Sequence, residues 1–183
     1  MIFTHLHFDH IGWATRDGAP VFPNATYRCD ARDWEYFVEP PPELVATEPA
    51  ADNPIATLTA PGGAAEFLAP IAGRLEAWDA SGPLIPGIDV RTAAGHTPGS
   101  TLIVLSSGTD RAILLGDVAH CPAELLEDEW AGIGDVDPKF ARETRVALAR
   151  ELEGDPVPVA GSHFPGLRLG RVIKGEGRRM WSA

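Results

Sequence analysis

The sequence of 183 residues predicts a layered α/β protein with its functional site on loops. Three observations support this fold class. Short apolar, β-branched runs recur along the chain, and each ends in glycine, serine or a polar residue, as a strand that enters a loop does. Two segments with helical spacing lie between these runs. Polar residues concentrate where the runs end, which is where layered α/β proteins carry their chemistry.

Five apolar runs predict strands, at residues 1–4, 88–93, 101–107, 111–116 and 157–161. The third and fourth are separated by the turn sequence Ser107-Gly108-Thr109-Asp110, which predicts a hairpin. The segment "LGRVIKGEGRRMWS" near the end predicts two further strands around Lys174–Gly177.

Two segments predict helices. Asp30 is a favourable N-cap for a short helix at 31–37, in which Trp34 and Phe37 fall on one side. Asp137 and Pro138 form an N-cap and first-turn pair for a longer helix that continues to Gly154. Its predicted inner face repeats every four residues, at Phe140, Thr144, Leu148 and Leu152.

Residues 38–61 contain six prolines in 24 positions, too many for a regular element. This segment predicts a long ordered loop. Two interpretations stay open, a lid that covers a substrate and a plain surface excursion.

Composition limits the classes of binding partner and the cellular compartment that we expect for this chain. Asp and Glu outnumber Lys and Arg by 26 to 15, so the net charge of −11 argues against nucleic acid and acidic membranes and leaves a small-molecule substrate as the expected partner. No apolar stretch long enough to span a membrane occurs, and the first ten residues are too polar for a signal peptide. Cys29 and Cys121 form no disulfide-rich pattern, which fits a reducing, cytoplasmic setting. We expect one domain over residues 1–183.

Six histidines, each close to the end of a predicted strand, are the strongest functional signal. In "HLHFDH", His5 and His7 alternate along an extended segment and so project to the same side, whereas Asp9 and His10 follow after the chain turns. One loop of this kind can supply ligands to two adjacent metal ions. The other three histidines are His96, His120 and His163.

Three later motifs supply what such a site still lacks. His96 lies in "AGHTPGS", Asp117 in "LLGDVAH" and His163 in "AGSHFPG". Imidazole nitrogen and carboxylate oxygen are ligands that Zn²⁺ accepts. Burying Asp117 directly after the apolar run "AILLG" is costly without a positive partner, and a carboxylate can bridge two cations.

The complete set, HxHxDH followed by a later His, a later Asp and a last His, resembles the metallo-β-lactamase superfamily. The resemblance implies an αβ/βα sandwich and a metal-dependent hydrolase that uses a hydroxide between two Zn²⁺ ions, with Mn²⁺ or Fe²⁺ as alternatives. It also implies three ligands for each ion and a shared one. One ion would take His5, His7 and His96, the other Asp9, His10 and His163, and Asp117 would bridge them.

The bridging Asp117 is typical of the branch that contains lactonases and methyl parathion hydrolases rather than true β-lactamases. The resemblance therefore implies an ester, lactone or phosphotriester substrate. Lactonases tend to carry a tyrosine three residues after this aspartate, and His120 occupies that place here, as on the parathion-hydrolase side. His120 joins Asp9 and Asp117 as a predicted catalytic residue, with a role in supporting a ligand as the alternative.

Other interpretations remain open at this stage. The same ligands accept iron, so a persulfide dioxygenase-like oxidoreductase is the first alternative and a non-catalytic fragment the second. Trp13, Trp34 and Phe37 are candidates for an apolar pocket wall, although core packing is the simpler interpretation.

The start of the chain differs from the family pattern. Superfamily members have several strands before HxHxDH, and here only residues 1–4 precede it, so we expect a sandwich that lacks its first strands. A trimmed gene model, a shortened protein completed by a partner and a degenerate fragment are the three explanations, and the first is favoured because every ligand is present. Self-association as a homo-oligomer would cover the strand edges left open.

Overall fold

The computed structural model describes residues 1–45 and 59–183, which divide into two compact units. Unit 1 comprises Met1–Asp79 together with Thr97–Gly99, and unit 2 comprises Ala80–His96 together with Ser100–Ala183. The expectation of a single domain stays a prediction.

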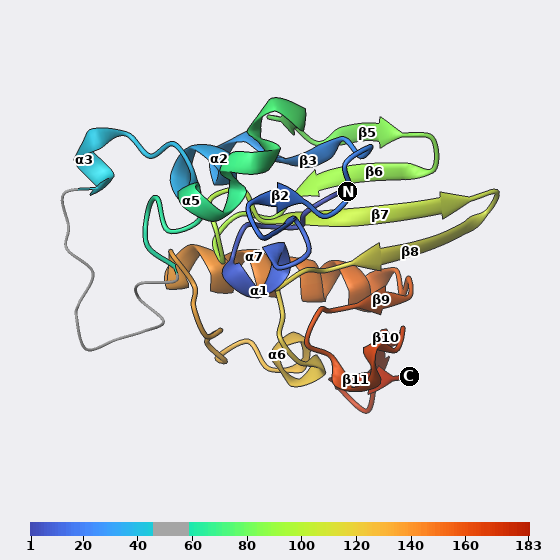
Figure 1. Ribbon diagram of the computed structural model, residues 1–183. Helices are drawn as coiled ribbons and strands as arrows, with labels where there is room; N and C mark the ends of the chain where they lie inside the picture. The colour runs from blue at the N-terminus through green and yellow to red at the C-terminus, as the bar shows by residue number, and fades with distance from the viewer. Residues whose placement is uncertain (46–58) are drawn as a thin grey trace. The chain divides into compact units, whose positions relative to one another are not determined.

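Unit 2 is built on a five-stranded sheet in the order β5-β6-β7-β8-β9 (Figure 1). Neighbours are antiparallel from β5 to β8, and β8 pairs with β9 in parallel. The predicted hairpin is confirmed, because Ser107 pairs with Asp110. The strands are β5 (Gly82–Ile85), β6 (Ile88–Thr92), β7 (Thr101–Ser107), β8 (Asp110–Leu114) and β9 (Val159–Ala160).

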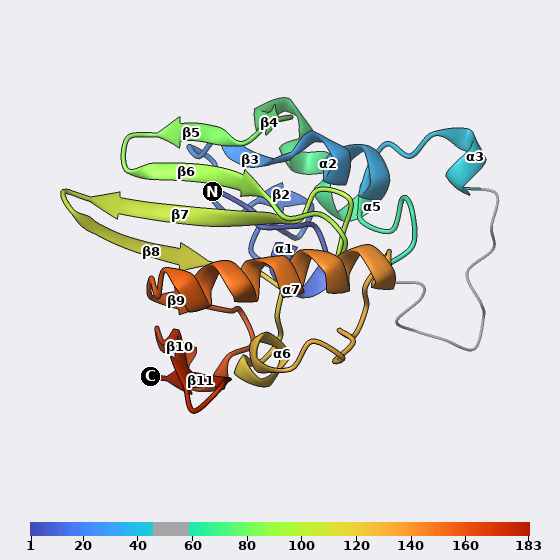
Figure 2. The ribbon, with the colours of Figure 1, turned by 180° about the vertical axis from the view of Figure 1, so that it is seen from behind.

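The long predicted helix is present as α7 (Pro138–Gly154) and lies across one face of this sheet (Figure 2). The Asp137 side chain caps it by accepting a hydrogen bond from the backbone N–H of Phe140 at 2.9 Å. Leu148 and Leu152 are buried against the strands, and each contributes about 1.5–3 kcal/mol by leaving water. Phe140, expected on the same inner face, is instead 48% exposed.

The start of α7 also packs against the loop that carries His96. Gly95 has φ +133°, and a Cβ at this position would collide with the backbone of Ala141. The backbone N–H groups of Val136 and Asp137 donate to the carbonyls of His96 and Gly95 at 2.9 and 3.0 Å. The helix start therefore fixes the backbone on which His96 stands.

The remainder of unit 2 follows β8 and β9. A short helix, α6 (Pro122–Leu126), comes shortly after Asp117, and the 3-10 turn η2 (Pro165–Leu167) follows His163. The strands β10 (Arg171–Gly175) and β11 (Arg178–Ser182) form the hairpin predicted at the end of the chain.

Unit 1 contains a parallel pair, β3 (Tyr27–Asp30) with β4 (Leu75–Trp78). The strand predicted at residues 1–4 is reduced to one parallel bridge between Ile2 and Arg28, held on either side by Met1 O and Phe3 N–H. The predicted helix α2 (Ala31–Phe37) is confirmed, with the Asp30 side chain as its cap.

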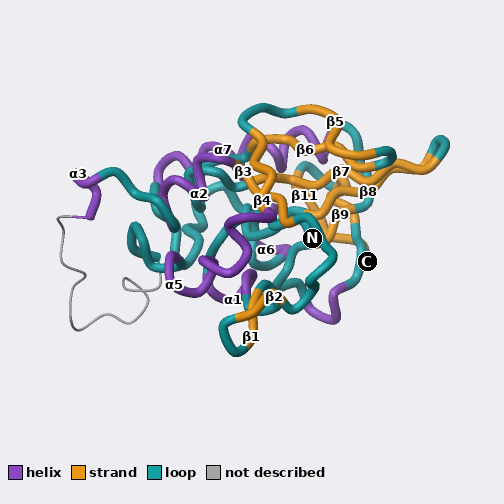
Figure 3. Tube along the Cα trace, turned by 45° about the horizontal axis from the view of Figure 1, so that its top comes forward, coloured by secondary structure: helices purple, strands orange, loops and turns teal. Residues whose placement is uncertain are grey.

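The other elements of unit 1 are short and were not predicted from the sequence. The turn α1 (Phe8–Ile11) is followed by the small hairpin of β1 and β2, which Figure 3 shows beside it. These elements are β1 (Thr15–Arg16), β2 (Ala19–Pro20), α3 (Pro42–Val45), α5 (Ala65–Leu68) and η1 (Ala69–Arg74).

Part of the proline-rich segment lies outside the described residues. Within 38–61, α3 (Pro42–Val45) is described, but residues 46–58 are not, so the lid and surface-loop interpretations both stay predictions. Among the described residues, none of the helices is long and apolar enough to cross a membrane.

Candidate metal centre

The HxHxDH motif brings three imidazole rings together within unit 1. The backbone is extended at His7, with φ −65° and ψ 152°, and turns into α1 at Phe8. The His5 and His7 rings lie 4.9 Å apart between centroids, which confirms that alternation places them on the same side. The turn of α1 then returns His10 to a centroid distance of 3.9 Å from His5.

These rings have polar neighbours within the same loop. The Thr4 hydroxyl lies 3.2 Å from His5 Nδ1. The carboxylate of Asp9, at the solvent-exposed start of α1, lies 3.5 Å from His10 Nε2. His5 and His7 are buried, with 1% and 4% of their surfaces exposed, whereas His10 is partly buried and Asp9 is exposed.

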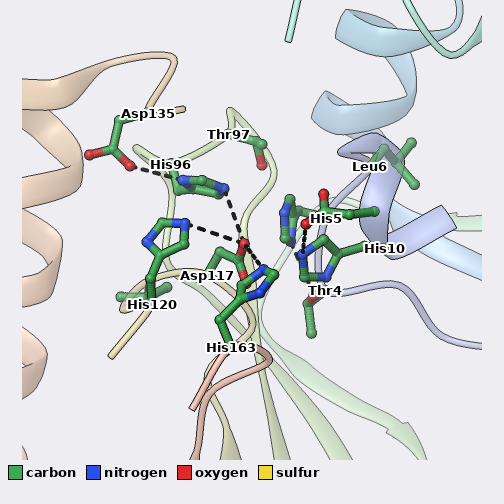
Figure 4. Close-up of polar contacts among 12 residues, drawn as sticks. Thr4, His5, Leu6, His10, His96, Thr97, Asp117, His120, Asp135 and His163 are labelled. Carbon is green, nitrogen blue, oxygen red and sulfur yellow. Dashed lines mark hydrogen bonds and ion pairs between the residues drawn. The ribbon is translucent and has the colours of Figure 1, made fainter. Parts of the chain in front are cut away.

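Asp117 is the centre of a second cluster, in unit 2. It follows β8 and is only 4% exposed, and its Oδ2 lies 3.1 Å from His163 Nε2 and 3.4 Å from His120 Nε2. His96 Nε2 is 3.8 Å from the same oxygen (Figure 4). The predicted ligands of this unit, His96, Asp117 and His163, do come together, and His120 joins them.

The backbone explains why Asp117 and His163 meet. Leu115 N–H donates to Ala160 O at 2.8 Å and so extends the β8–β9 pairing past the last strand residue. Gly116 then takes a positive φ of 56°, which glycine adopts without strain, and its carbonyl accepts from Ser162 N–H at 3.2 Å. The loops that carry Asp117 and His163 therefore begin next to each other at the end of the sheet and are joined by a hydrogen bond.

A buried carboxylate orients His96. Asp135 Oδ1 lies 2.9 Å from His96 Nδ1, and the two side chains are 1% and 2% exposed. A carboxylate at Nδ1 favours the proton on that nitrogen, which leaves the Nε2 lone pair facing Asp117. This arrangement is typical of metal-binding histidines.

His120 also has an acid behind it. Glu124 Oε2 accepts from the His120 backbone N–H at 2.9 Å and lies 3.6 Å from its Nδ1. Although burial lowers the pKa of His120, the neighbouring carboxylates of Asp117 and Glu124 raise it to about 10. A cation at Asp117 would act in the opposite direction, because it takes up negative charge that His120 faces.

Glu124 is in turn linked to a fully buried arginine. Burial raises the pKa of Glu124, but His120 and the Arg145 guanidinium outweigh it, so the pKa is lowered overall. Arg145 Nη1 lies 3.7 Å from Glu124 Oε2, and its guanidinium donates to the carbonyls of Val118 and Trp130 at 3.1 Å. The acid therefore stays ionised next to His120.

Sequence reasoning missed three acids that support the histidine loops. Asp135 and Glu124 act in unit 2, and in unit 1 the buried Asp33 accepts a hydrogen bond from Leu6 N–H at 3.0 Å. Leu6 and Asp33 are 27 residues apart in the chain, and His96 and Asp135 are 39 apart. The general rule that a carboxylate stands behind a metal-bound histidine suggests such residues but does not name them.

The core-packing interpretation is confirmed for Trp34 and Phe37, which are buried. Trp13 is instead 70% exposed and lines a small pocket together with Gly12, Thr15, Arg16 and Val21. An apolar pocket of about 350 Å³ does open in unit 1, beside the HxHxDH motif. Its described lining residues are Leu6, Phe8, Ile11, Gly12, Gly63, Ala64 and Phe67.

The donors present fit divalent cations. In unit 2 the ligand atoms of His96, Asp117 and His120 all lie within 4.8 Å of one another, close to the separation of atoms that share an ion with bonds of about 2.0–2.2 Å. The set consists of imidazoles and a carboxylate, which suits Zn²⁺. A buried carboxylate surrounded by imidazoles is also stabilised by a cation, because that satisfies its charge.

The chain belongs to the metallo-β-lactamase superfamily: the family described as Metallo-beta-lactamase superfamily matches residues 1–163. The α/β fold class and the resemblance predicted from the motifs are thereby confirmed. No curated protein sequence matches the chain.

Solved structures extend this result. AbOPH, a hydrolase in the β-lactamase superfamily, is 26% identical with a TM-score of 0.83, and the match covers 99% of this chain and 62% of that one. AidC, a dizinc quorum-quenching lactonase, is 24% identical with a TM-score of 0.83, and the match covers 98% of this chain and 62% of AidC. At this identity the likeness shows the fold alone. A probable metal-dependent hydrolase from Staphylococcus aureus is 20% identical, with a TM-score of 0.75 over 99% and 60%. The chain thus spans less than two thirds of the length of these proteins.

Proposed function

We propose that the chain carries the binuclear metal site of a hydrolase that cleaves a small ester or lactone with an apolar acyl group. The observation that carries this proposal is the buried Asp117 carboxylate, which has His96, His120 and His163 gathered around one oxygen. A buried acid among imidazoles is costly for a purely structural role and suits a bridging ligand.

The proposed ligand sets follow the family pattern. His5, His7 and His96 would hold one ion, Asp9, His10 and His163 would hold the second, and Asp117 would contribute to both. Two observations support the sets, each within one unit. The rings of the HxHxDH loop converge in unit 1, and the later ligands converge on Asp117 in unit 2.

When bound, two divalent cations lower the pKa of a water molecule towards neutrality and polarise the bond to be cleaved. The side chains of the protein supply orientation and proton transfer. Asp9, the exposed acid of the motif, would orient the attacking water. His120 Nε2, which faces Asp117 while Glu124 stands behind Nδ1, would donate a proton to the leaving oxygen.

The apolar pocket supports the substrate class. Leu6 and Phe8 belong to the HxHxDH motif, in alternation with its histidines, and line a hollow of about 350 Å³. Phe8 and Phe67 are 53% and 40% exposed, so aromatic surface is available to a ligand. A hollow of this size and polarity suits an acyl chain better than a charged group.

A phosphotriester is the second candidate substrate, and His120 is the residue that favours it. Histidine stands at the place where lactonases tend to carry tyrosine, and it resembles the organophosphate-hydrolysing side of the branch. An aryl phosphotriester would present its apolar group to the same pocket.

The test uses the full chain, purified and supplemented with zinc. We expect bound zinc by elemental analysis, and hydrolysis of an aryl ester, an N-acyl lactone or an aryl phosphotriester that a chelator abolishes and zinc restores. Folded protein that remains metal-free after supplementation would contradict the proposal. Bound iron with oxygen uptake would favour the oxidoreductase alternative instead.

A further inference from the structure

Asp33 connects two loops that lead to predicted metal ligands, all within unit 1. Its side chain is fully buried in the first turn of α2. Oδ2 accepts from Leu6 N–H and from the Thr97 hydroxyl, each at 3.0 Å, and Oδ1 accepts from Gly99 N–H at 2.6 Å. Leu6 stands between His5 and His7, and Thr97 directly follows His96 in the chain.

This arrangement is not an ordinary helix cap. The cap of α2 is Asp30, whose Oδ1 accepts from Arg32 N–H at 2.9 Å. An acid three residues after the cap usually returns a hydrogen bond to the cap backbone, as in a capping box. The hydrogen bonds of Asp33 lead away from the helix instead, to backbone and side-chain donors of the two loops.

The packing around Asp33 is so close that the position of Asp33 determines the position of the loop after His96. A Cβ on Gly99 would lie 2.8 Å from the Asp33 backbone nitrogen and 2.9 Å from its Cβ, so the loop after His96 rests directly on the start of α2. Because not even a methyl group fits at Gly99, the loop packs closely against α2 and has little room to shift.

The carboxylate is costly at this position. Burial raises the pKa of Asp33 to about 7, although Thr97, Gly99 and Leu6 all donate to it. A neutral side chain of similar shape would avoid the desolvation penalty. An ionised carboxylate, however, offers two acceptor oxygens and so serves all three donors at once.

We propose that Asp33 is a positioning residue for metal binding, which fixes the backbone of the HxHxDH loop and of the loop after His96 and thereby sets the metal affinity of the site. The inference rests on the proposed metal-dependent function. Asp33 touches neither ion nor substrate and acts through the ligands on the two loops.

Asp33→Asn gives the most direct test, because asparagine keeps the shape but replaces one oxygen with an NH₂ group. Whichever way the amide turns, its NH₂ faces either Gly99 N–H or the Leu6 and Thr97 donors. Thr97→Val is the milder second variant, since it removes one donor and leaves the acid in place. Asp30→Asn is the matched control, because Asp30 is a buried acid that caps the same helix and whose side chain bonds to Arg32.

The measurements are Zn²⁺ affinity in competition with a chromophoric chelator, the visible spectrum of the Co²⁺-loaded protein, and thermal unfolding without metal. We expect Asp33→Asn to bind Zn²⁺ about 10–100-fold more weakly and to alter the Co²⁺ spectrum, with a smaller loss for Thr97→Val. Asp30→Asn should keep wild-type affinity even where its thermal stability falls.

Three results would overturn the proposal. Asp33→Asn and Thr97→Val could bind metal as the wild type does, or Asp30→Asn could weaken binding as much as Asp33→Asn at similar stability. A wild type that binds no metal would remove the proposed function and this inference together, which distinguishes that failure from the first two. If Asp33→Asn does not fold, Thr97→Val decides the question.

Discussion

The predicted metal ligands of unit 1 and those of unit 2 are organised differently. In unit 2 the histidines gather around one carboxylate, and two of them have a further acid at the other ring nitrogen, Asp135 behind His96 and Glu124 behind His120. In unit 1 the rings of the HxHxDH motif pack against one another, and the backbone between them is anchored by Asp33. The acids of unit 2 fix charge and tautomer, whereas Asp33 in unit 1 fixes loop geometry.

This difference indicates two ways of preparing a metal site. An acid at the second ring nitrogen acts electronically, because it selects the tautomer and raises the basicity of the metal-facing nitrogen. A hydrogen bond to the loop backbone acts sterically, because it determines the backbone position from which the ligand side chain projects. Variants in unit 2 should therefore change the chemistry of the bound metal, and variants at Asp33 should change how well the ligands converge.

The largest effect is expected from Asp117→Asn. The amide halves the acceptor oxygens and removes the charge that the imidazoles surround, so hydrolysis should fall by roughly 10³-fold, as when a group acting directly on the developing charge is lost. Bound zinc should fall as well, measured by elemental analysis. Full zinc content with full activity would show that the cluster of unit 2 does not bridge the ions.

Asp135→Asn should have the next largest effect. The amide no longer fixes the proton on His96 Nδ1, so zinc affinity should fall about 10–100-fold in chelator competition. Asp137→Asn is the control, because asparagine caps a helix about as well as aspartate. Equal losses for both variants would mean that the loop, rather than the His96 tautomer, had been disturbed.

Glu124→Gln tests whether His120, unlike the other clustered histidines of unit 2, acts without binding metal. Because Glu124 contacts the one clustered histidine without a metal in the proposed sets, kcat should fall about 10-fold while zinc content stays unchanged. Glu129→Gln, at a side chain 82% exposed and paired with Arg142, should leave both unchanged. Loss of zinc in Glu124→Gln would identify His120 as a ligand.

The smallest effect concerns pH and Asp33. The pKa of this acid is raised from 3.8 to about 7 in the folded chain, so between these values the folded state holds more protons than the unfolded state. The stability linked to this group is therefore complete below about pH 4 and is lost as pH rises through about pH 7. Without metal, the free energy of unfolding of the wild type should fall relative to Asp33→Asn by about 1 kcal/mol from pH 5.5 to 6.5, measured by urea denaturation. Parallel pH profiles would exclude titration of Asp33 in this range.

Much of unit 2 could be predicted from local signals. The runs that became β6, β7 and β8 are β-branched and bounded by turn residues, and the capped start of α7 is visible as Asp137 followed by Pro138. Unit 1 was harder, because β3 and β4 are four residues long and form a parallel pair from segments more than 40 residues apart. No local pattern specifies such a partner.

For the site, the sequence by itself determined the donor chemistry. His5 and His7 had to share a side because alternation in an extended chain requires it, and the order of histidines and aspartates identified the family. Tertiary structure alone decided which acids support them. Asp33, Glu124 and Asp135 are ordinary acids in the sequence and acquire their roles through hydrogen bonds to groups elsewhere in the chain. Ligand identity is a property of residue type and spacing, whereas ligand orientation depends on contacts that only the folded chain creates.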